Sequence, residues 1–302
     1  MIGSADQSIA GLAASHPCFT EGAGLLHGRI HLPVAACCNL GCDFCQRAVG
    51  IRAARLGGPG TARRVVRPAE AAARVDAVME RGPLHVVGIA GPGEPLANRE
   101  TFETLRLVGA RYPDLVLCLS TNGLLLADAL PRLSRLNLRA VTVTINAVRS
   151  EVAARIYSWA HIEGKLLLGR DAAREILQRQ WLGLARAVAA GLLVKVNSVL
   201  IPGVNDDHLP AVAQRAGELG AHRQNVMPLL PRGRMQQRRA PTRREVAYVQ
   251  SQCGRWLRQF RGCTQCSADA IEMPPTGASG ESICEAPACK EKEGASCVLA
   301  TL

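Results

Sequence analysis

The feature that most constrains the fold is a group of three cysteines, Cys38, Cys42 and Cys45, which directly follows an apolar run at residues 30–36. Thiolates are the usual ligands of iron–sulfur clusters. Because three local thiolates leave one iron of a four-iron cluster open, the spacing predicts a redox cluster at the end of a strand. Such a cluster can present its open iron to S-adenosylmethionine (SAM) and pass it one electron. Gly41 is expected to let the loop bend tightly.

Two other interpretations fit the same three cysteines. With Cys37 or His31 as a fourth ligand they would bind zinc, and without metal they would pack as small hydrophobic side chains. Structural zinc sites usually pair two C-x2-C knuckles across a gap, which this stretch does not contain. The spacing therefore favours the redox cluster.

The charge of the chain indicates which partners to expect. Its 36 Lys and Arg residues exceed its 25 Asp and Glu residues, giving a net charge of +11. This surplus could attract an anionic cofactor, acidic partners or nucleic acid. The densest basic stretch, residues 232–244, contains no aromatic residue for base stacking, so we expect a solvated linker and no nucleic acid.

Twelve cysteines are many for a chain of 302 residues. Residues 1–15 lack the pattern of a secretory signal, and no apolar stretch is long enough to span a membrane. We therefore expect a cytoplasmic protein without a membrane segment, in which clustered cysteines bind metal.

Six apolar runs alternate with helical stretches. The candidate strands are residues 30–36, 85–90, 115–120, 140–146, 192–200 and 225–230, and the candidate helices are residues 68–81, 99–111, 127–136, 171–190 and 207–219. This alternation predicts an α/β fold with a parallel sheet curled into a partial (β/α)6 TIM-like barrel. We divide the chain into a leader at 1–26, the barrel at 27–232, a C-terminal helix with a C-x2-C segment at 233–272, and a flexible tail at 273–302.

Polar residues follow the ends of the predicted strands, where ligands bind in such folds. An amino-acid-bearing nucleoside needs a carboxylate for its ammonium group, and amides and hydroxyls for its carboxylate and ribose. Singly these residues are weak signals, since Gly-Pro-Gly and Thr-Asn-Gly are common turns. Together they predict a SAM site formed by Glu94, Ser120, Thr121, Asn122, Asn146, Lys195, Asn197, Ser198, Ile201 and Met227.

Other parts of the chain give weaker signals. Residues 150–170 form an insertion that could cover the barrel or pack its aromatic residues into the core. Cys263 and Cys266 could chelate one cluster or metal ion. His16 and Cys18 stand two residues apart in the leader, and on the residues alone they are incidental. Cys284, Cys289 and Cys297 match no site.

Several separate segments resemble the NifB family of radical-SAM enzymes. They are residues 16–18, 29–45, 88–98, 120–124, 141–148, 156–159, 195–206 and 263–270, so the resemblance covers about residues 16–271. It implies the radical-SAM partial barrel, with the leader and the C-terminal extension folded over the barrel mouth. A 4Fe–4S cluster on Cys38, Cys42 and Cys45 would cleave SAM.

The resemblance also implies a substrate, namely two additional 4Fe–4S clusters. The matching ligand positions are His16, Cys18, Cys118, Cys263 and Cys266. One SAM would methylate a cluster sulfide, and a second would yield a 5′-deoxyadenosyl radical that takes hydrogen from that methyl group. The carbon would become the carbide of an 8Fe precursor of the nitrogenase cofactor. Iron–sulfur donors, cofactor-maturation proteins and a reductant such as ferredoxin would be partners.

The chain departs from the family pattern in two places. The family has a further cysteine shortly after the third one of the motif, whereas residues 46–51 contain none, and Gly262 and Ser267 replace a histidine and an arginine. Two alternatives therefore stay open. One is a divergent radical-SAM enzyme that modifies a peptide or RNA and holds an auxiliary cluster. The other is a non-catalytic iron–sulfur carrier.

Overall fold

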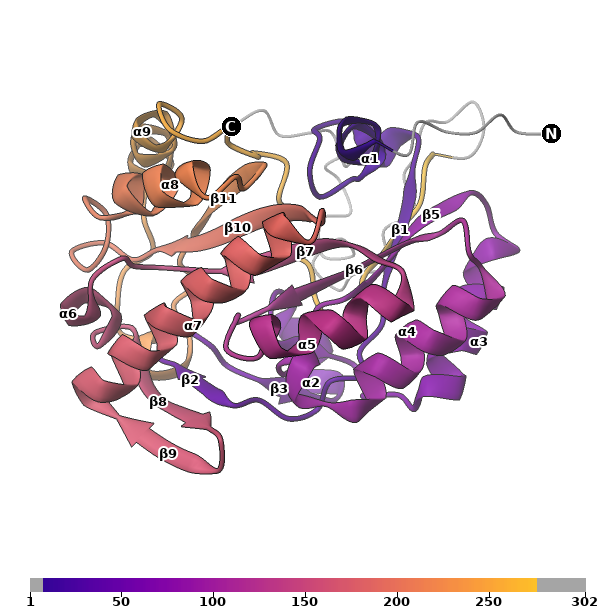
Figure 1. The fold of residues 1–302 in the computed structure, drawn as a ribbon, viewed down its shortest axis with the longest axis horizontal. Helices are drawn as coiled ribbons and strands as arrows, with labels where there is room; N and C mark the ends of the chain where they lie inside the picture. The colour runs from indigo at the N-terminus through magenta and orange to yellow at the C-terminus, as the bar shows by residue number, and fades with distance from the viewer. Residues whose placement is uncertain (1–7, 276–302) are drawn as a thin grey trace.

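The structure, a computed structural model, describes residues 8–275 and is built on a seven-stranded sheet (Figure 1). The strand order is β11-β10-β7-β6-β5-β1-β12, and β11 and β12 form the two edges. Six strands are parallel, namely β1 (Gly28–His31), β5 (Leu84–Ile89), β6 (Val116–Thr121), β7 (Leu138–Thr144), β10 (Leu193–Leu200) and β11 (Arg223–Pro228). They correspond to the six predicted strands, and the α/β half-barrel is confirmed.

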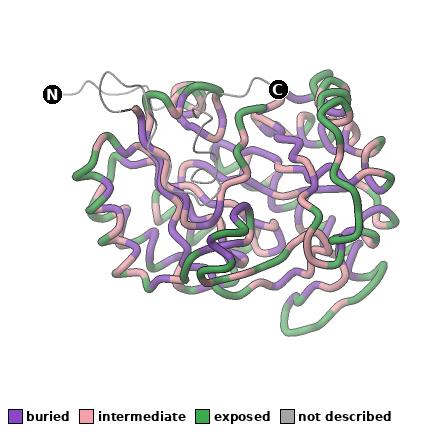
Figure 2. Tube along the Cα trace, turned by 180° about the vertical axis from the view of Figure 1, so that it is seen from behind, coloured by how far each residue is buried: buried purple, intermediate pink, exposed green. Residues whose placement is uncertain are grey.

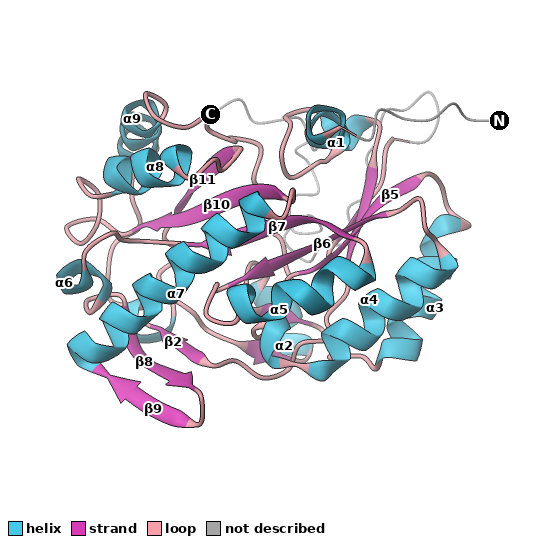
Figure 3. Ribbon diagram, viewed as in Figure 1, coloured by secondary structure: helices cyan, strands magenta, loops and turns pink. Residues whose placement is uncertain are grey.

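Helices follow the strands and cover one face of the sheet (Figure 3). They are α3 (Pro68–Met79), α4 (Arg99–Arg111), α5 (Leu126–Leu133), α7 (Gly169–Ala189) and α8 (Leu209–Glu218). The helix α3 shows why these segments fold so: Pro68 opens it, and Ala71, Val75 and Val78 recur on one buried face. None of the helices in the described part of the chain is long and apolar enough to cross a membrane.

The leader contains a helix that the sequence did not predict. This helix, α1 (Ile9–Ser15), is short, and its N-cap Ser8 accepts a hydrogen bond from the backbone of Gly11. Leu12 packs with Phe19 against the first residues of β10 and the lower part of β7. The leader therefore approaches the barrel from the amino ends of the strands, on the side away from β2 and α2 (Figure 1), rather than over the mouth as predicted.

The C-terminal segment closes the open side of the half-barrel. After α9 (Arg243–Cys253), Gln259 forms a bridge with Gln224 of β11. The chain then reaches β12 (Ile271–Glu272), which pairs antiparallel with β1. Residues 259–272 thus join the two ends of the parallel sheet. Of the predicted tail only 273–275 are described, and Cys284, Cys289 and Cys297 lie outside the described residues.

The insertion at 150–170 braces the cysteine loop. After the short helix α6 (Ser150–Ala153) come β8 (Tyr157–Ile162) and β9 (Lys165–Leu168), and β8 pairs with β2 (Leu40–Cys42). A Cβ added to Gly41 would lie 2.3 Å from Nε1 of Trp159. The glycine is therefore required for this close approach, and not for a special bend as expected. The hairpin tip is exposed (Figure 2).

A small excursion links the cysteine loop to α3. It consists of β3 (Ala48–Val49), α2 (Ile51–Leu56) and β4 (Thr61–Ala62), and the two strands pair with each other. Arg232 donates hydrogen bonds to the carbonyl oxygens of Leu56 and Gly57. The basic stretch after β11 is thus partly bound to this excursion rather than wholly solvated.

Candidate iron–sulfur and SAM site

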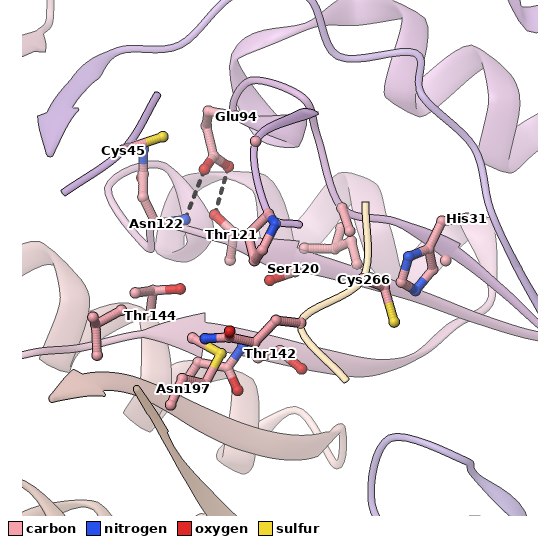
Figure 4. A pocket seen from close by; sticks show the side chains of 18 of the residues that line it. His31, Cys45, Glu94, Ser120, Thr121, Asn122, Thr142, Thr144, Asn197 and Cys266 are labelled. Carbon is pink, nitrogen blue, oxygen red and sulfur yellow. Dashed lines mark hydrogen bonds between the residues drawn. The ribbon is translucent and has the colours of Figure 1, made fainter. Parts of the chain in front are cut away.

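One cavity inside the half-barrel collects most of the predicted site residues (Figure 4). Its wall combines the strand ends, the cysteine loop, the leader and the C-terminal segment. The predicted residues that line it are His16, Cys18, Cys38, Cys42, Cys45, Glu94, Cys118, Ser120, Thr121, Asn122, Lys195, Asn197, Met227, Cys263 and Cys266.

Three predicted SAM contacts do not line this cavity. Asn146 is buried, donating to the Tyr157 hydroxyl at 2.9 Å and accepting from the backbone of Val199 at 2.7 Å. Ser198 donates to a carbonyl oxygen of the preceding strand end, and the backbone of Ile201 donates to an asparagine side chain. These residues join the ends of β7 and β10 by hydrogen bonds. They therefore stabilise the strand ends that carry the cavity wall, and they do not face the cavity.

The first set of sulfur ligands, which we call the triplet, is Cys38, Cys42 and Cys45. Burial raises the pKa of all three thiols, that of Cys38 to about 11 and that of Cys42 well above the usual value. Neighbouring thiolates add to the rise in the pKa of Cys42, and the charge of Arg47 opposes it without cancelling it. Three ionised sulfurs at this place therefore need more positive charge than the nearby arginines supply. The donor set therefore fits a cationic iron–sulfur core.

The zinc interpretation finds no support. Among residues 8–275, no three His, Cys, Asp or Glu side chains converge tightly enough to hold a single metal ion. Cys37 is exposed and its backbone is held by Asn98, while His31 contacts the backbone of Ser267. A four-iron cluster, in contrast, offers a separate iron to each thiolate.

Glu94 lies beside the triplet and is buried. Its carboxylate accepts hydrogen bonds from the Thr121 hydroxyl at 2.6 Å and the Asn122 backbone at 2.7 Å (Figure 4). It also accepts one from the Leu96 backbone at 3.0 Å. Burial nevertheless raises the pKa of this carboxyl to about 7. A ligand ammonium group would stabilise the ionised form, and the free lone pairs of the carboxylate can accept from it.

The second set, which we call the deep group, comprises Cys18, Cys118, Cys263 and Cys266 together with two histidines. These residues, the histidines being His16 and His31, come from the leader, β1, β6 and the C-terminal segment. Arg29 donates to the sulfur of Cys18 at 2.6 Å and to that of Cys266 at 3.1 Å, and it also pairs with Glu272. The arginine therefore crosslinks the two ends of the chain through their thiols.

The charges around the deep group differ from those around the triplet. Burial alone would raise the pKa of Cys18, but Arg29 and Lys195 outweigh it and hold that pKa well below the usual value. Lys195 also donates to the carbonyl oxygen of Cys18 at 2.7 Å. Burial raises the pKa of Cys118 to about 12, and that of Cys266 is raised as well. The deep group thus has one thiol already poised as a thiolate.

Each histidine has one ring nitrogen held by the backbone. Nδ1 of His16 accepts from the backbone of Cys18 at 3.1 Å, and its Nε2 is buried at the cavity wall without a hydrogen-bond partner in the described part of the chain. Nδ1 of His31 lies 3.2 Å from the carbonyl oxygen of Ser267. The unpartnered Nε2 fits the predicted role of His16 as a cluster ligand, and His31 is a second histidine at the same wall.

Arg29 and His31 are cavity residues that the sequence reasoning had not placed at the substrate site. They stand two apart in β1, so both side chains point to the same face, toward the cavity. Gly88 leaves room beside them: an added Cβ would lie 3.0 Å from the His31 ring and 3.1 Å from the sulfur of Cys118. The strand alternation was the signal that could have identified them.

The structure also shows the surroundings of the residues that depart from the family pattern. Gln46 and Arg47 line the cavity where a further cysteine is missing. Ser267 is buried and donates to Asp269 at 2.7 Å, and an added Cβ at Gly262 would lie 3.2 Å from the Phe260 ring. No thiol replaces the missing one at residues 46–51.

Comparison with known proteins extends this picture. Residues 32–216 match the model of the Radical SAM superfamily. The chain is 40% identical over 263 residues to "FeMo cofactor biosynthesis protein NifB" of Methanocaldococcus infernus, covering 87% of this chain and 86% of that protein. It is 42% identical over 273 residues to the protein of the same name from Klebsiella pneumoniae, of which it covers 58%.

Solved structures share the fold at low sequence identity. Streptococcus suis SuiB aligns with a TM-score of 0.55 at 14% identity, covering 80% of this chain and 51% of that one. A radical SAM methyltransferase from Sphaerobacter thermophilus aligns with a TM-score of 0.50 at 20% identity, covering 78% and 64%. The fold, the matched domain and the extent of the similarity agree. The chain therefore belongs to the radical SAM superfamily of enzymes and, within it, to the NifB family.

Proposed function

We propose that this enzyme assembles the carbide-containing 8Fe precursor of the nitrogenase cofactor from two 4Fe–4S units. The observation that carries the proposal is that the triplet and the deep group line one cavity, although the deep group comes from segments as distant as Cys18 and Cys266. The cleavage of SAM itself needs only the triplet. The names of the relatives, which refer to FeMo cofactor biosynthesis, support the same conclusion.

The triplet side of the cavity would serve SAM. The cluster, when bound, supplies the electron that cleaves SAM. The chain's own residues hold and orient the cofactor: Glu94 would accept from the ammonium group, and Asn122 and Asn197 would bind its carboxylate and ribose. Asn122 is itself held by a hydrogen bond from its side-chain nitrogen to Asn39 at 2.8 Å. This hydrogen bond fixes the orientation of the Asn122 side chain, so a ligand can bind to it in few positions.

The deep group would hold the substrate clusters. Cluster units with thiolate ligands are anionic, and Arg29 and Lys195 place two positive charges beside them. One SAM would transfer its methyl group to a cluster sulfide and leave as S-adenosylhomocysteine. A second SAM would be cleaved, and hydrogen taken from that methyl group would leave as 5′-deoxyadenosine. The carbon would lose its two other hydrogens as protons and take electrons from the cluster irons and the reductant. It would then become the central carbide as the units fuse with an added sulfur.

One observation favours a second candidate. Because residues 46–51 contain no cysteine, one substrate cluster has fewer thiolates available than the family pattern implies. The deep group could then hold an auxiliary cluster in an enzyme that modifies a peptide or RNA. A cytoplasmic location, and iron–sulfur donors, maturation proteins and ferredoxin as partners, remain predictions under the main proposal.

Labelled SAM separates these candidates. The anaerobically reconstituted protein would be incubated with reductant and SAM carrying a ¹⁴C methyl group, with Cys42→Ala as the control that cannot cleave SAM. Cluster assembly predicts both 5′-deoxyadenosine and label that stays with the iron–sulfur fraction until acid destroys it. Cleavage of SAM with no label in that fraction would overturn the proposal in favour of another substrate. If SAM is not cleaved at all, the protein is a non-catalytic iron–sulfur carrier.

A further inference from the structure

The excursion after the triplet carries a basic and apolar surface, which we call the α2 face. It consists of Arg47, Val49, Ile51, Arg52, Arg55 and Leu56. Residues 44–69 contain six arginines and no acidic residue.

The burial pattern shows that α2 presents one side to solvent. Ala53 and Ala54 are buried, whereas Ile51, Arg52, Arg55 and Leu56 are exposed. Ile51 is 73% exposed and Leu56 is 41% exposed. Val49, just before the helix, adds a third exposed aliphatic side chain. An apolar surface of this kind between arginines is typical of the centre and rim of protein interfaces.

The charges of the α2 face are not neutralised by neighbouring elements. In the described part of the chain, Arg47, Arg52 and Arg55 form no ion pair, whereas Arg64 pairs with Glu70 on the far side of the excursion. Asp269 binds the backbone of Arg63 rather than a side chain of the α2 face. Asp43 lies 3.9 Å from Arg234, which compensates it. The face therefore presents a net positive field to solvent.

The α2 face lies directly beside the triplet. Arg47 is two residues after Cys45 and lines the cavity. A Cβ added to Gly60, between α2 and β4, would lie 3.3 Å from the sulfur of Cys45. The excursion thus packs on one ligand of the cluster that must be reduced.

We propose that the α2 face docks an acidic one-electron donor protein, an iron–sulfur or flavin protein of net negative charge. The proposal rests on the proposed function, because only a SAM-cleaving enzyme needs such a donor. One electron passes from the donor's centre to the cluster on the triplet, so the donor is oxidised by one electron and the cluster is reduced by one. Transient redox complexes use small interfaces, and the six residues of the α2 face form a surface small enough for such a complex. Residues 45–70 contain no aromatic side chain for stacking, which disfavours nucleic acid.

The test compares two double charge reversals of equal size. Arg52→Glu with Arg55→Glu alters the α2 face without touching the cavity. Arg243→Glu with Arg244→Glu makes the same charge change at exposed positions of α9. The probe is a ferredoxin of net negative charge, and two readouts are taken: its affinity for the cluster-loaded protein at several salt concentrations, and 5′-deoxyadenosine formed with ferredoxin or with dithionite as reductant.

The α2 variant should bind ferredoxin about tenfold more weakly at low salt and lose part of the salt dependence, because rim charges set the rate of encounter. Its ferredoxin-driven rate should fall similarly, while its dithionite-driven rate stays unchanged. Equal effects in the α9 variant, or undiminished binding by the α2 variant, would overturn the proposal. If the wild-type protein cleaves no SAM with dithionite, the proposed function fails, and the binding experiment still decides whether the face docks the donor. Circular dichroism and iron content confirm that each variant is folded and loaded.

Discussion

The triplet and the deep group line the same cavity but are built in opposite ways. The triplet comes from eight consecutive residues and is braced by β8, and burial raises the pKa of all its thiols. The deep group is assembled from the leader, two strands and the C-terminal segment. Burial raises the pKa of Cys118 and Cys266 there too, but Arg29 and Lys195 hold the pKa of Cys18 low. The deep group therefore has positive charges of its own beside its sulfurs, Arg29 on Cys18 and Cys266 and Lys195 beside Cys18. The triplet suits a resident cofactor and the deep group an anionic substrate that enters and leaves.

This difference predicts that the two sets can be disrupted separately. A change in the triplet should remove SAM chemistry altogether, because both halves of the reaction need it. A change in the deep group should spare SAM cleavage and remove only the substrate clusters. A change in the charged residues around the thiols should alter the affinity for SAM or for iron without removing the triplet or the deep group.

The largest effect is expected for Cys42→Ala. A site with two thiolates should not hold the cluster in its redox-competent form, so formation of 5′-deoxyadenosine should fall to background. The matched control is Cys37→Ala, since Cys37 is exposed and does not line the cavity. Persistent SAM cleavage by the Cys42 variant would refute the cluster assignment, and loss of iron in the control would make Cys37 a ligand.

The next largest effect separates the two histidines. His16→Ala should lower the iron content by about four atoms per chain while SAM cleavage persists, because its buried, unpartnered Nε2 can bind a cluster iron once the ring proton has left it. His31→Ala is the comparison variant, since Nδ1 of His31 contacts the backbone of Ser267. Iron and sulfide analysis after reconstitution measures both. Loss of iron in the His31 variant alone would make His31 the ligand.

Glu94→Gln should weaken SAM binding by about ten- to a hundredfold, the loss expected for one charge-assisted hydrogen bond. In the wild-type protein the carboxyl has a pKa of about 7, and SAM needs its ionised form. Affinity should therefore fall as the pH drops below about 7, by up to tenfold for each pH unit. Titration of SAM by calorimetry from pH 5.5 to 8 tests this, and the variant should lack the dependence. A flat wild-type profile would rule out contact between Glu94 and the ammonium group.

The smallest effect is expected at Arg29. Arg29→Gln removes the charge that lowers the pKa of Cys18, so ligation there must release a proton at neutral pH. Iron retention in the deep group should then fall by a few-fold from pH 8 to pH 6.5, whereas the wild-type protein stays nearly constant. Arg29→Lys, which keeps the charge, is the control. If iron retention depends on pH in the same way in all three proteins, the charge of Arg29 has no effect on ligation by Cys18.

Local patterns predicted the parallel strands, the helices after them and the triplet, because each depends on residues close in sequence. The leader helix α1 was missed, since seven residues with one buried leucine give little periodic signal. The brace between Gly41 and Trp159 and the closure of the sheet by residues 259–272 depend on contacts between distant segments. No pattern within either segment predicts such contacts.

The same limit applies to the site. Asn146 stands at a strand end like Asn122, yet its side chain turns to Tyr157 and Val199 rather than to the cavity. Which way a side chain turns there depends on the neighbouring strand, and the sequence of one strand does not determine it. The tautomers of His16 and His31 likewise depend on which backbone group each ring meets.

The most direct test of the account is the iron and sulfide content of the anaerobically reconstituted wild-type protein, measured together with 5′-deoxyadenosine under reductant. If the triplet and the deep group hold separate clusters, the protein should bind about twelve irons per chain and cleave SAM. About four irons with SAM cleavage would contradict the account, because the deep group would then hold no substrate cluster.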